Sequence, residues 1–500
     1  MALTALDLPQ GVSRKGTLYQ TKGRWYDSDL VRGHEGNLGP IGGWTQRITS
    51  AMTGSARAMV VWKDNTASIR YIGIGTHSKL YAATQSLSAM VDITPVGFTS
   101  GLADATSGAG YGVGNYGAGT YGTPRVDNVS VQDASMWTLD IFGQYLVGVM
   151  SDDGKLYEWQ LDISTPTKAA IVTNAPTSNQ ACVVTEQGFL VALGAGGNPR
   201  KVQWSDQGVN TTWTPSATNQ AGSYTLQSQS RLMCGKRVRG GTLLFTENDV
   251  HMMTYIGLPY VHRIDRVGDN CGIISRGAVA VSDARAMWMS QSGFYAWDGS
   301  GVQAVPCEIY DYVFGDMNTT QCSKFWAMTN AQQSEAFFFW CSASSTEIDR
   351  CAAFNFDDGT WWLHPSLTRT CGADRGGVFN NPLMATSTGY VYDHETGYSW
   401  GTTPYIESGP IEMGDGEFVM RARRLIMDEK TTSDAYAYFK VRDWPNSTET
   451  TYGPYSGSNP IALRFAARAL RMKVSFVTAA ASRWGPPKLH LLPAGKRLAA

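Results

Sequence analysis

The chain has 500 residues, of which 43% are hydrophobic and 17% charged, and its formal net charge is −1. At about 150 residues per domain, this length suggests roughly two to four domains with a large apolar core and a surface poor in charge. The near-zero net charge argues against a dedicated nucleic-acid binder, which normally carries a basic stripe, and no apolar run is long enough to predict a membrane-spanning helix.

Residues 1–50 are polar and rich in glycine, with scattered aromatic residues. The first residues, MALTALDLPQGVSRKG, lack the apolar region of a secretory signal. A stretch of this composition is more typical of an extended segment than of a core. We therefore predict that residues 1–50 form an N-terminal arm; the family resemblance described below implies that this arm is part of a platform built from terminal segments.

Residues 51–400 show short β-type runs separated by Gly, Asp, Asn and Ser, and almost no helical periodicity. One unit recurs, in which an apolar strand is followed by a polar turn and then by a strand rich in Tyr or Trp. Its copies are residues 70–84, 144–162, 284–301 and 381–397. Hairpins that recur every 40–60 residues or so are typical of propeller blades, which bury their faces against neighbouring blades. We predict a mainly β protein with an irregular β-propeller over 51–400, of undetermined blade number.

A glycine- and tyrosine-rich loop is predicted at 101–125, and its residues 108–122 read GAGYGVGNYGAGTYG. The stretch matches the dinucleotide fingerprint GxGxxG twice, but a dinucleotide site needs a strand before it and a helix after it. The residues that follow, TPRVDNVSV, have no helical period. We predict instead a projecting loop that contacts a neighbouring subunit or ring through Tyr111, Tyr116 and Tyr121, since tyrosine offers an apolar ring with a polar tip.

Residues 401–500 contain short strands again and are predicted to form a β-sandwich or barrel-like platform module. Five arginines lie among the apolar residues of these strands. A solvated surface is the commonest position for scattered arginines, and pairing with acids of neighbours or facing DNA stay open as alternatives. These arginines are Arg421, Arg423, Arg464, Arg468 and Arg471.

No catalytic, cofactor or metal motif is found. The acidic pairs Asp152-Asp153 and Asp357-Asp358 each precede a glycine, which is typical of turns. The seven histidines are dispersed, and the eight cysteines contain no CxxC pair and no zinc spacing, so we predict buried, reduced thiols. We predict that the protein is not an enzyme and needs no cofactor.

Several longer motifs resemble the tail nozzle proteins of short-tailed bacteriophages, also called packaged-DNA stabilisation or tail tubular B-type proteins. The resemblance extends over nearly the whole chain. It is carried by LLFTENDVHMMTY (243–255), GDNCGI (268–273), MWMSQSGFYAWDG (287–299), CEIYDYVF (307–314), RWYDSDLVRGHEGNLGPIGGW (24–44), ESGPIEMGDGEFVMRARRLIMD (407–428) and KVRDWPNSTETTYGPY (440–455).

The resemblance implies a structural protein of the virion tail, assembled in the bacterial cytoplasm. Such proteins form a ring, expected to be a hexamer, below the portal and its adaptor. The ring extends the DNA channel, helps to retain the packaged genome, conducts double-stranded DNA on ejection, and contacts tail fibres or a needle or plug. The alternative is a propeller-type tail component that binds or cleaves a receptor polysaccharide. Its candidates would be Trp297, Trp361 and Trp362 for stacking on sugar and Asp357 and Asp358 as acids.

Overall fold

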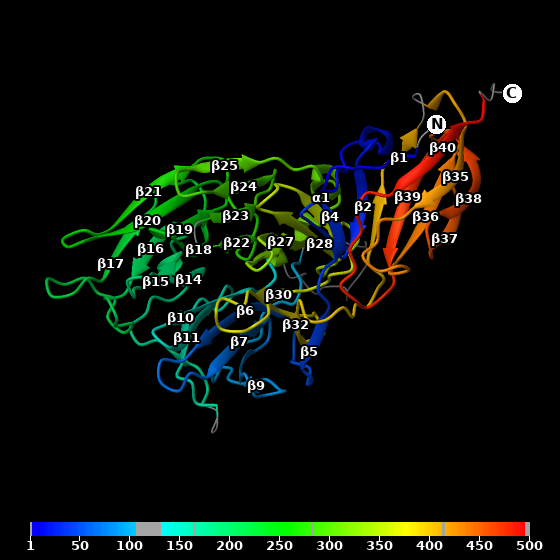
Figure 1. Cartoon of the computed structure of the whole chain (residues 1–500). Helices are drawn as coiled ribbons and strands as arrows, with labels where there is room; N and C mark the ends of the chain where they lie inside the picture. The colour runs from blue at the N-terminus through cyan, green and yellow to red at the C-terminus, as the bar shows by residue number, and fades with distance from the viewer. Residues whose placement is uncertain (1–2, 107–131, 164–166, 283–284, 413–415, 496–500) are drawn as a thin grey trace, which may run out of the picture.

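The structure, a computed structural model, describes residues 3–106, 132–163, 167–282, 285–412 and 416–495. The described residues form seven four-stranded blades and a β-sandwich (Figure 1). Four short helices have their full extent within these ranges, and none of the described helices has the length and apolar character needed to cross a membrane. The four are α1 (Tyr310–Phe314), η1 (Leu18–Thr21), η2 (Ala195–Gly197) and η3 (Thr319–Lys324).

In the first four blades, consecutive strands are antiparallel neighbours. Blade 1 contains β6 (Ala56–Lys63), β7 (Arg70–Thr76), β8 (Leu80–Thr84) and β9 (Val91–Asp92). Blade 2 contains β10 (Trp137–Phe142), β11 (Tyr145–Met150), β12 (Leu156–Trp159) and β13 (Ala170–Ile171). Blade 3 contains β14 (Ala181–Val184), β15 (Leu190–Leu193), β16 (Lys201–Trp204) and β17 (Gly222–Thr225). Blade 4 contains β18 (Leu232–Val238), β19 (Gly241–Thr246), β20 (Val250–Gly257) and β21 (Val261–Gly268).

The last blade is completed by a strand from the beginning of the chain. Blade 5 contains β22 (Val279–Ser282), β23 (Arg285–Met289), β24 (Phe294–Trp297) and β25 (Val302–Val305). Blade 6 contains β26 (Trp326–Asn330), β27 (Glu335–Trp340), β28 (Arg350–Asn355) and β29 (Trp361–Leu363). Blade 7 contains β30 (Cys371–Ala373), β31 (Leu383–Ala385), β32 (Val391–His394) and then β5 (Trp44–Ile48) as its outer strand.

The blades close into a ring. The first strand of each blade contacts the first strand of the next, from β6 through β10, β14, β18, β22 and β26 to β30, and β30 contacts β6 again. The predicted propeller is therefore confirmed, and it has seven blades. Our boundary at residue 50 assigned Trp44–Ile48 to the N-terminal arm, whereas pairing with β32 places this strand in the propeller.

The recurring hairpin of the sequence is the middle of a blade. Residues 70–84 form β7 and β8, 144–162 contain β11 and β12, 284–301 contain β23 and β24, and 381–397 contain β31 and β32. In all four pairs the strands are antiparallel partners. Middle strands are covered on both faces by neighbouring blades, so they are apolar throughout instead of alternating, as the fully buried residues 71–76 of β7 show.

One glycine shows how closely the blades pack. A Cβ atom on Gly75 in β7 would lie 2.3 Å from Cγ of Trp137, the first residue of β10 in blade 2. The Trp137 indole N–H donates to the carbonyl oxygen of Thr76 at 2.8 Å. Glycine at 75 thus makes room for a large ring that fixes blade 2 against blade 1.

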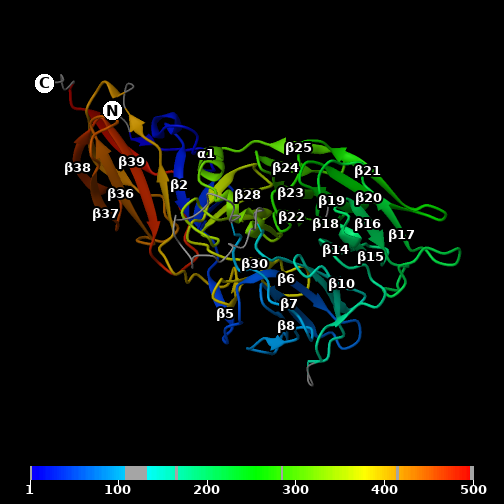
Figure 2. The same ribbon diagram turned by 180° about the vertical axis from the view of Figure 1, so that it is seen from behind.

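Both ends of the chain build the sandwich, which lies at the opposite end of the molecule from blades 3 and 4 (Figures 1 and 2). Its two sheets do not close into a barrel. Of the two forms predicted for the C-terminal module, sandwich or barrel, the sandwich is therefore confirmed. One sheet has the order β1 (Thr4–Ala5), β40 (Lys488–Pro493), β35 (Met420–Ile426), β38 (Ile461–Ala467). The other has the order β2 (Trp25–Asp29), β33 (Tyr405–Ser408), β39 (Ala469–Phe476), β36 (Ala435–Arg442), β37 (Thr450–Tyr455), with β34 (Ile411–Glu412) also paired to β39.

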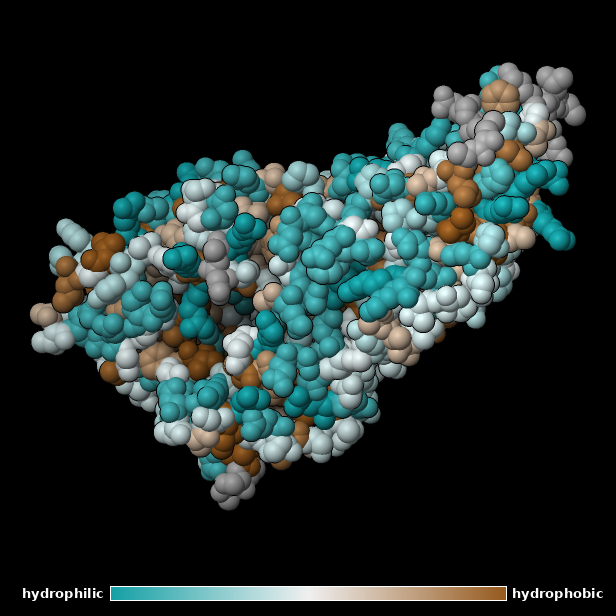
Figure 3. All heavy atoms as spheres, in the orientation of Figure 1, coloured by the Kyte–Doolittle hydropathy of each residue, from teal (hydrophilic) through white to brown (hydrophobic). Residues whose placement is uncertain are grey.

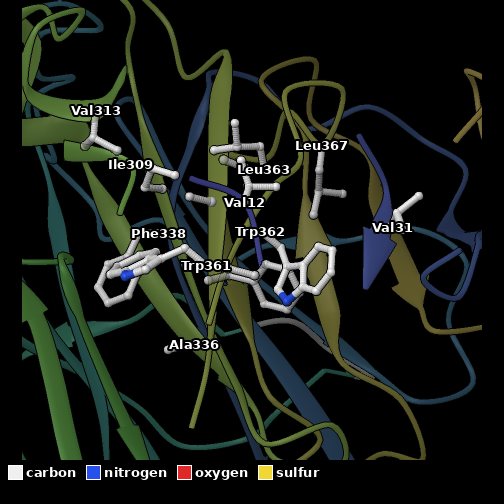
Figure 4. Close-up of a cluster of buried hydrophobic side chains, with 14 of the residues drawn as sticks. Val12, Val31, Ile309, Val313, Ala336, Phe338, Trp361, Trp362, Leu363 and Leu367 are labelled. Atoms are coloured by element: carbon white, nitrogen blue, oxygen red, sulfur yellow. The ribbon is translucent and has the colours of Figure 1, made fainter. Parts of the chain in front are cut away.

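The propeller and the sandwich share one hydrophobic core. The N-terminal residues Val12 and Val31 pack with Trp362 and Leu363 of β29 in blade 6 (Figure 4). The backbone N–H of Val12 donates to Trp361 at 2.7 Å, and Val31 begins β3 (Val31–His34), which pairs with β4 (Asn37–Pro40). The N-terminal arm is thus bound to the outer strand of a blade.

Candidate functional site

A polar cavity of about 640 Å³ lies at one end of the propeller axis. Gln180, Arg231 and Arg276 line it from the segments just before β14, β18 and β22. Because these strands surround the axis, the residues that precede them meet at its end. The remaining lining residues come from the connection between blades 1 and 2 and from the β11–β12 turn. They include Gly101, Leu102, Gln132, Asp133, Asp152 and Asp153.

The same connection carries the glycine- and tyrosine-rich loop. Thr106 and Gln132 form an antiparallel bridge, with the N–H of each donating to the carbonyl of the other at 2.9 and 3.0 Å. We call this pair the stem, since it joins the two described segments on either side of residues 107–131. The predicted contact residues Tyr111, Tyr116 and Tyr121 lie outside the described residues. The stem nevertheless fixes the origin of the loop beside the axial cavity.

Two side chains of η3, which connects blades 5 and 6, hold the stem. The Gln321 amide in η3 accepts from the N–H of Ala105 and donates to its carbonyl, both at 2.9 Å. The fully buried Lys324 ammonium binds the Asp104 carboxylate and the Thr346 carbonyl. Polar groups this well satisfied are costly to displace, so the stem is a fixed part of the propeller face.

Arg57 adds a third anchor. Its guanidinium, on β6, donates to the carbonyl of Ala103 at 2.9 Å and pairs with both oxygens of Glu347 at 2.8 and 2.9 Å. The Arg57 side chain is almost fully buried. Although burial would raise the pKa of Glu347, the hydrogen bonds and charge of Arg57 hold it below its ordinary value. The ion pair is therefore formed at neutral pH.

The cavity carries both signs of charge. Arg231 binds Glu247 at 2.7 Å and Asp133 at 3.1 Å. Arg276 donates to the backbone and side-chain oxygens of Gln180 at 2.7 and 2.8 Å. Burial lowers the pKa of Arg276, and the Arg231 charge lowers it further. A mixed, hydrogen-bonded lining of this kind can bind polar chain segments.

The acidic pairs are turn residues, as the sequence predicted. Asp152 accepts from the Ser135 hydroxyl and Asp153 from the Tyr157 hydroxyl. Asp358 accepts from the N–H and hydroxyl of Thr360 in the β28–β29 turn. In the described ranges, no group of three or more His, Cys, Asp or Glu side chains is placed to hold a metal ion.

The proposed sugar-stacking tryptophans are core residues. Trp297, Trp361 and Trp362 are 5%, 1% and 0% exposed. Figure 4 shows Trp361 and Trp362 among other buried side chains. A ring that stacks on sugar must present a face to solvent, so these three residues cannot form a sugar platform.

All eight cysteines are free, six of them buried and two half-buried. Burial raises the thiol pKa, to about 11 for Cys234, Cys271 and Cys322. These thiols stay protonated at neutral pH and are poor nucleophiles.

The fold and the axial site define a class: a seven-bladed β-propeller extended by a β-sandwich made from both chain ends. No protein-family model matches the sequence, and no curated protein matches it. Two solved propellers are similar in structure. The Pan2 WD40 domain of Neurospora crassa is 10% identical with a TM-score of 0.39, and the match covers 72% of this chain and 95% of that domain. The Cps50 (Swd1) β-propeller domain of Myceliophteria thermophila is 7% identical with a TM-score of 0.39, and the match covers 69% and 98%.

Proposed function

We propose that this protein is a structural subunit of the tail nozzle of a short-tailed bacteriophage, assembled as a ring of six copies below the portal adaptor. The ring would extend the DNA channel, retain the packaged genome and conduct it on ejection. The observation that carries the proposal is the architecture. A propeller joined to a platform made from both terminal segments is what the resemblance of the motifs implies, and the sandwich contains both ends of the chain.

The candidate site supports a role in assembly over one in catalysis. Three buried polar side chains hold the stem, from which the predicted glycine- and tyrosine-rich loop starts, at one propeller face. A loop held at its base and rich in tyrosine is suited to contact another subunit or another ring.

A second feature that fits assembly is the tip of the β20–β21 hairpin. Ile256, Leu258 and Tyr260 are 50%, 70% and 76% exposed there. The hairpin projects from blade 4, and Figure 3 shows apolar atoms at this end of the molecule. Exposed apolar residues clustered on a projection commonly mark a protein contact.

The proposal is tested first by mass. The purified full chain, or the assembly recovered with its adaptor, should give a ring of about six copies by light scattering and negative-stain microscopy. A monomer or trimer that removes a polysaccharide coat would contradict the nozzle assignment and favour the polysaccharide-directed alternative.

Replacing Leu258 and Tyr260 with serine should raise the protein concentration needed for ring formation by tenfold or more. Each of the two side chains contributes about 1.5–3 kcal/mol when a neighbouring subunit buries it, and serine loses this contribution. Thermal unfolding of the monomer should not change, because both side chains are exposed there. The matched control is Val96→Ser, a 90% exposed residue that follows β9 in blade 1. Equal ring formation by both variants would exclude the hairpin tip from the interface.

Removing 108–122 should impair ring or tail assembly and leave the propeller folded. The stem bridge between Thr106 and Gln132 keeps the two ends adjacent, so a short glycine linker can replace the missing residues. Circular dichroism and the thermal midpoint should match the parent chain, while assembly onto tailless particles should fall. Normal particle assembly by the deletion variant would exclude the loop as a contact.

A further inference from the structure

The sandwich sheet β1-β40-β35-β38 has a basic outer face. Along β35, buried Met420, Ala422 and Leu425 alternate with exposed arginines, and β38 alternates in the same way around Arg464. Arg421 is paired with Ala466 and Arg424 with Ala462, so Arg464 lies between them in the neighbouring strand. We call the four arginines the basic face: Arg421, Arg423, Arg424 and Arg464.

Across the other edge of β35, the basic face continues onto β40. His490 is the cross-strand partner of Arg424, and the exposed Lys488 is two residues away in the same strand. Like charges gathered on one face of neighbouring strands repel each other. A sheet that keeps the four arginines together is therefore expected to use them for an anionic partner.

Within the described part of the chain, none of the four arginine side chains has a hydrogen bond or an ion pair. The other sheet is different: Arg471 binds Glu407 and Glu449, and Lys440 binds Glu407. Two arginines that look alike in sequence, Arg464 and Arg471, thus have opposite environments, one exposed and one 9% exposed and paired.

The charge of the chain is also divided. Residues 401–500 hold 14 of the 41 Lys and Arg residues but 9 of the 42 Asp and Glu residues, and no acidic residue follows Glu449. The net charge of −1 therefore hides a basic C-terminal segment and an acidic remainder. Such an asymmetry between parts of a chain is typical of electrostatic binding to a polyanion.

The residues around the arginines indicate which polyanion. One large apolar side chain, Leu3, is 42% exposed where it precedes β1 at the edge of this sheet. A protein partner normally needs a cluster of anchor residues that it can bury, and a single leucine at the edge does not provide one. The described part of the face also lacks an exposed aromatic ring on which unpaired bases would stack. Guanidinium groups match phosphate oxygens in geometry and charge. A flat face of arginines therefore suits the phosphate backbone of a duplex.

We propose that the basic face binds the phosphate backbone of double-stranded DNA without sequence preference. The inference deepens the proposed function, and rests on it for the choice of DNA among phosphate-bearing polymers. The face lies on the sandwich, at the far end of the molecule from blades 3 and 4 (Figure 1). Only this part of the protein would hold DNA, which leaves the propeller face free for contacts with other subunits.

The test is the salt dependence of binding of the full chain to a fluorescent 20-base-pair DNA duplex. Neutralising four phosphates gives a slope of log K against log salt of about −3.6, which is a loss of about 150-fold between 50 and 200 mM salt. Each Arg→Gln change on the basic face should reduce the steepness by about 0.9. The variant R421Q/R464Q should therefore bind with a slope of about −1.8.

Two controls distinguish the effect of the basic face from the effect of changing the total charge of the protein. R239Q/R285Q removes the same charge from exposed positions of the propeller and should keep the parent slope. R421K/R464K keeps the charge and should keep most of the slope. All variants should melt at about the temperature of the parent, since the four arginine side chains make no hydrogen bond or ion pair that would be lost. Equal slopes for R421Q/R464Q and R239Q/R285Q, or no binding by the parent chain, would overturn the inference.

Ring formation is measured on the same samples. If R421Q/R464Q binds DNA like the parent but no longer forms a ring or docks on its adaptor, the face binds an acidic protein surface and the DNA inference is wrong. If DNA binding behaves as expected and no ring forms under any condition, the proposed nozzle function fails while the DNA-binding face remains.

Discussion

Replacing Arg32 with methionine should lower the free energy of unfolding by about 3–5 kcal/mol, because it leaves two buried carboxylates without their cation. Arg32 lies on β3 and pairs with Glu335 of β27 at 2.7 Å and with Glu395, which follows β32, at 2.6 Å. The three side chains are 8%, 1% and 11% exposed. This group joins the N-terminal arm to blades 6 and 7, so its loss should loosen the joint between sandwich and propeller.

The loss should depend on pH. Burial alone would raise the pKa of Glu395, but the charge and hydrogen bonds of Arg32 hold it below its ordinary value. A lowered carboxyl pKa stabilises the fold above the unfolded pKa of about 4.3, and this contribution is lost as pH falls through the folded pKa. Without Arg32, burial would raise the pKa of Glu395, and that cost grows as pH rises. The difference between parent and variant should therefore be larger at pH 7 than at pH 4.

Denaturant unfolding at both pH values checks this prediction. The control is Arg263→Met, which breaks the exposed pair with Asp265 and should cost under about 1 kcal/mol. Changing Glu335 and Glu395 to glutamine in the Arg32→Met background should recover part of the loss, because the uncompensated charges are then gone. A loss for Arg32→Met no larger than for Arg263→Met would mean that the buried group does not hold the joint.

Replacing Trp361 or Trp362 with alanine should each cost about 3–5 kcal/mol. Successive side chains of a strand point to opposite faces, so the two rings serve different contacts. Trp361 packs on Phe294 with ring centroids 4.5 Å apart, and its indole N–H donates to the Pro306 carbonyl at 2.9 Å. Trp362 faces the N-terminal arm, where a Cβ atom on Gly33 would lie 2.7 Å from its ring.

Trp444→Ala is the matched control, since Trp444 is 50% exposed and contacts the Arg468 guanidinium at 4.4 Å from the ring centroid. An exposed cation–π contact contributes about 0.5–1 kcal/mol. In urea unfolding, Trp444→Ala should keep a much higher free energy of unfolding than the Trp361→Ala and Trp362→Ala variants. Loss of carbohydrate binding by stable Trp361 or Trp362 variants would instead show that these rings can reach solvent.

The sequence predicted the blade hairpins because they are local. A run such as 144–162 contains two apolar strands and the glycine turn between them, so its period and turn residues are enough to place a hairpin. The same holds for turn carboxylates such as Asp358, which accepts hydrogen bonds from Thr360 two residues away. The predicted contact tyrosines, by contrast, lie outside the described residues, and their role stays a prediction.

The components of the axial site had no sequence signal. The side chains that hold the stem are far from it in the sequence. Gln321 is 216 residues from Ala105, and Lys324 is 220 residues from Asp104. Gln321 and Lys324 are ordinary polar residues in their own surroundings. Ring closure brings them to the stem, and no spacing in the chain encodes that.

By itself the sequence determined the β character, the repeated hairpin and a C-terminal segment of short strands, since period and turn chemistry act over a few residues. Tertiary structure alone decided the number of blades, the use of Trp44–Ile48 to close blade 7, and the burial of Trp361 and Trp362. It also divided the C-terminal arginines, burying Arg468 and Arg471 and leaving Arg421, Arg423 and Arg464 exposed. The physical reason is that burial and charge pairing depend on which face of a strand another sheet covers, and that is set by segments hundreds of residues apart.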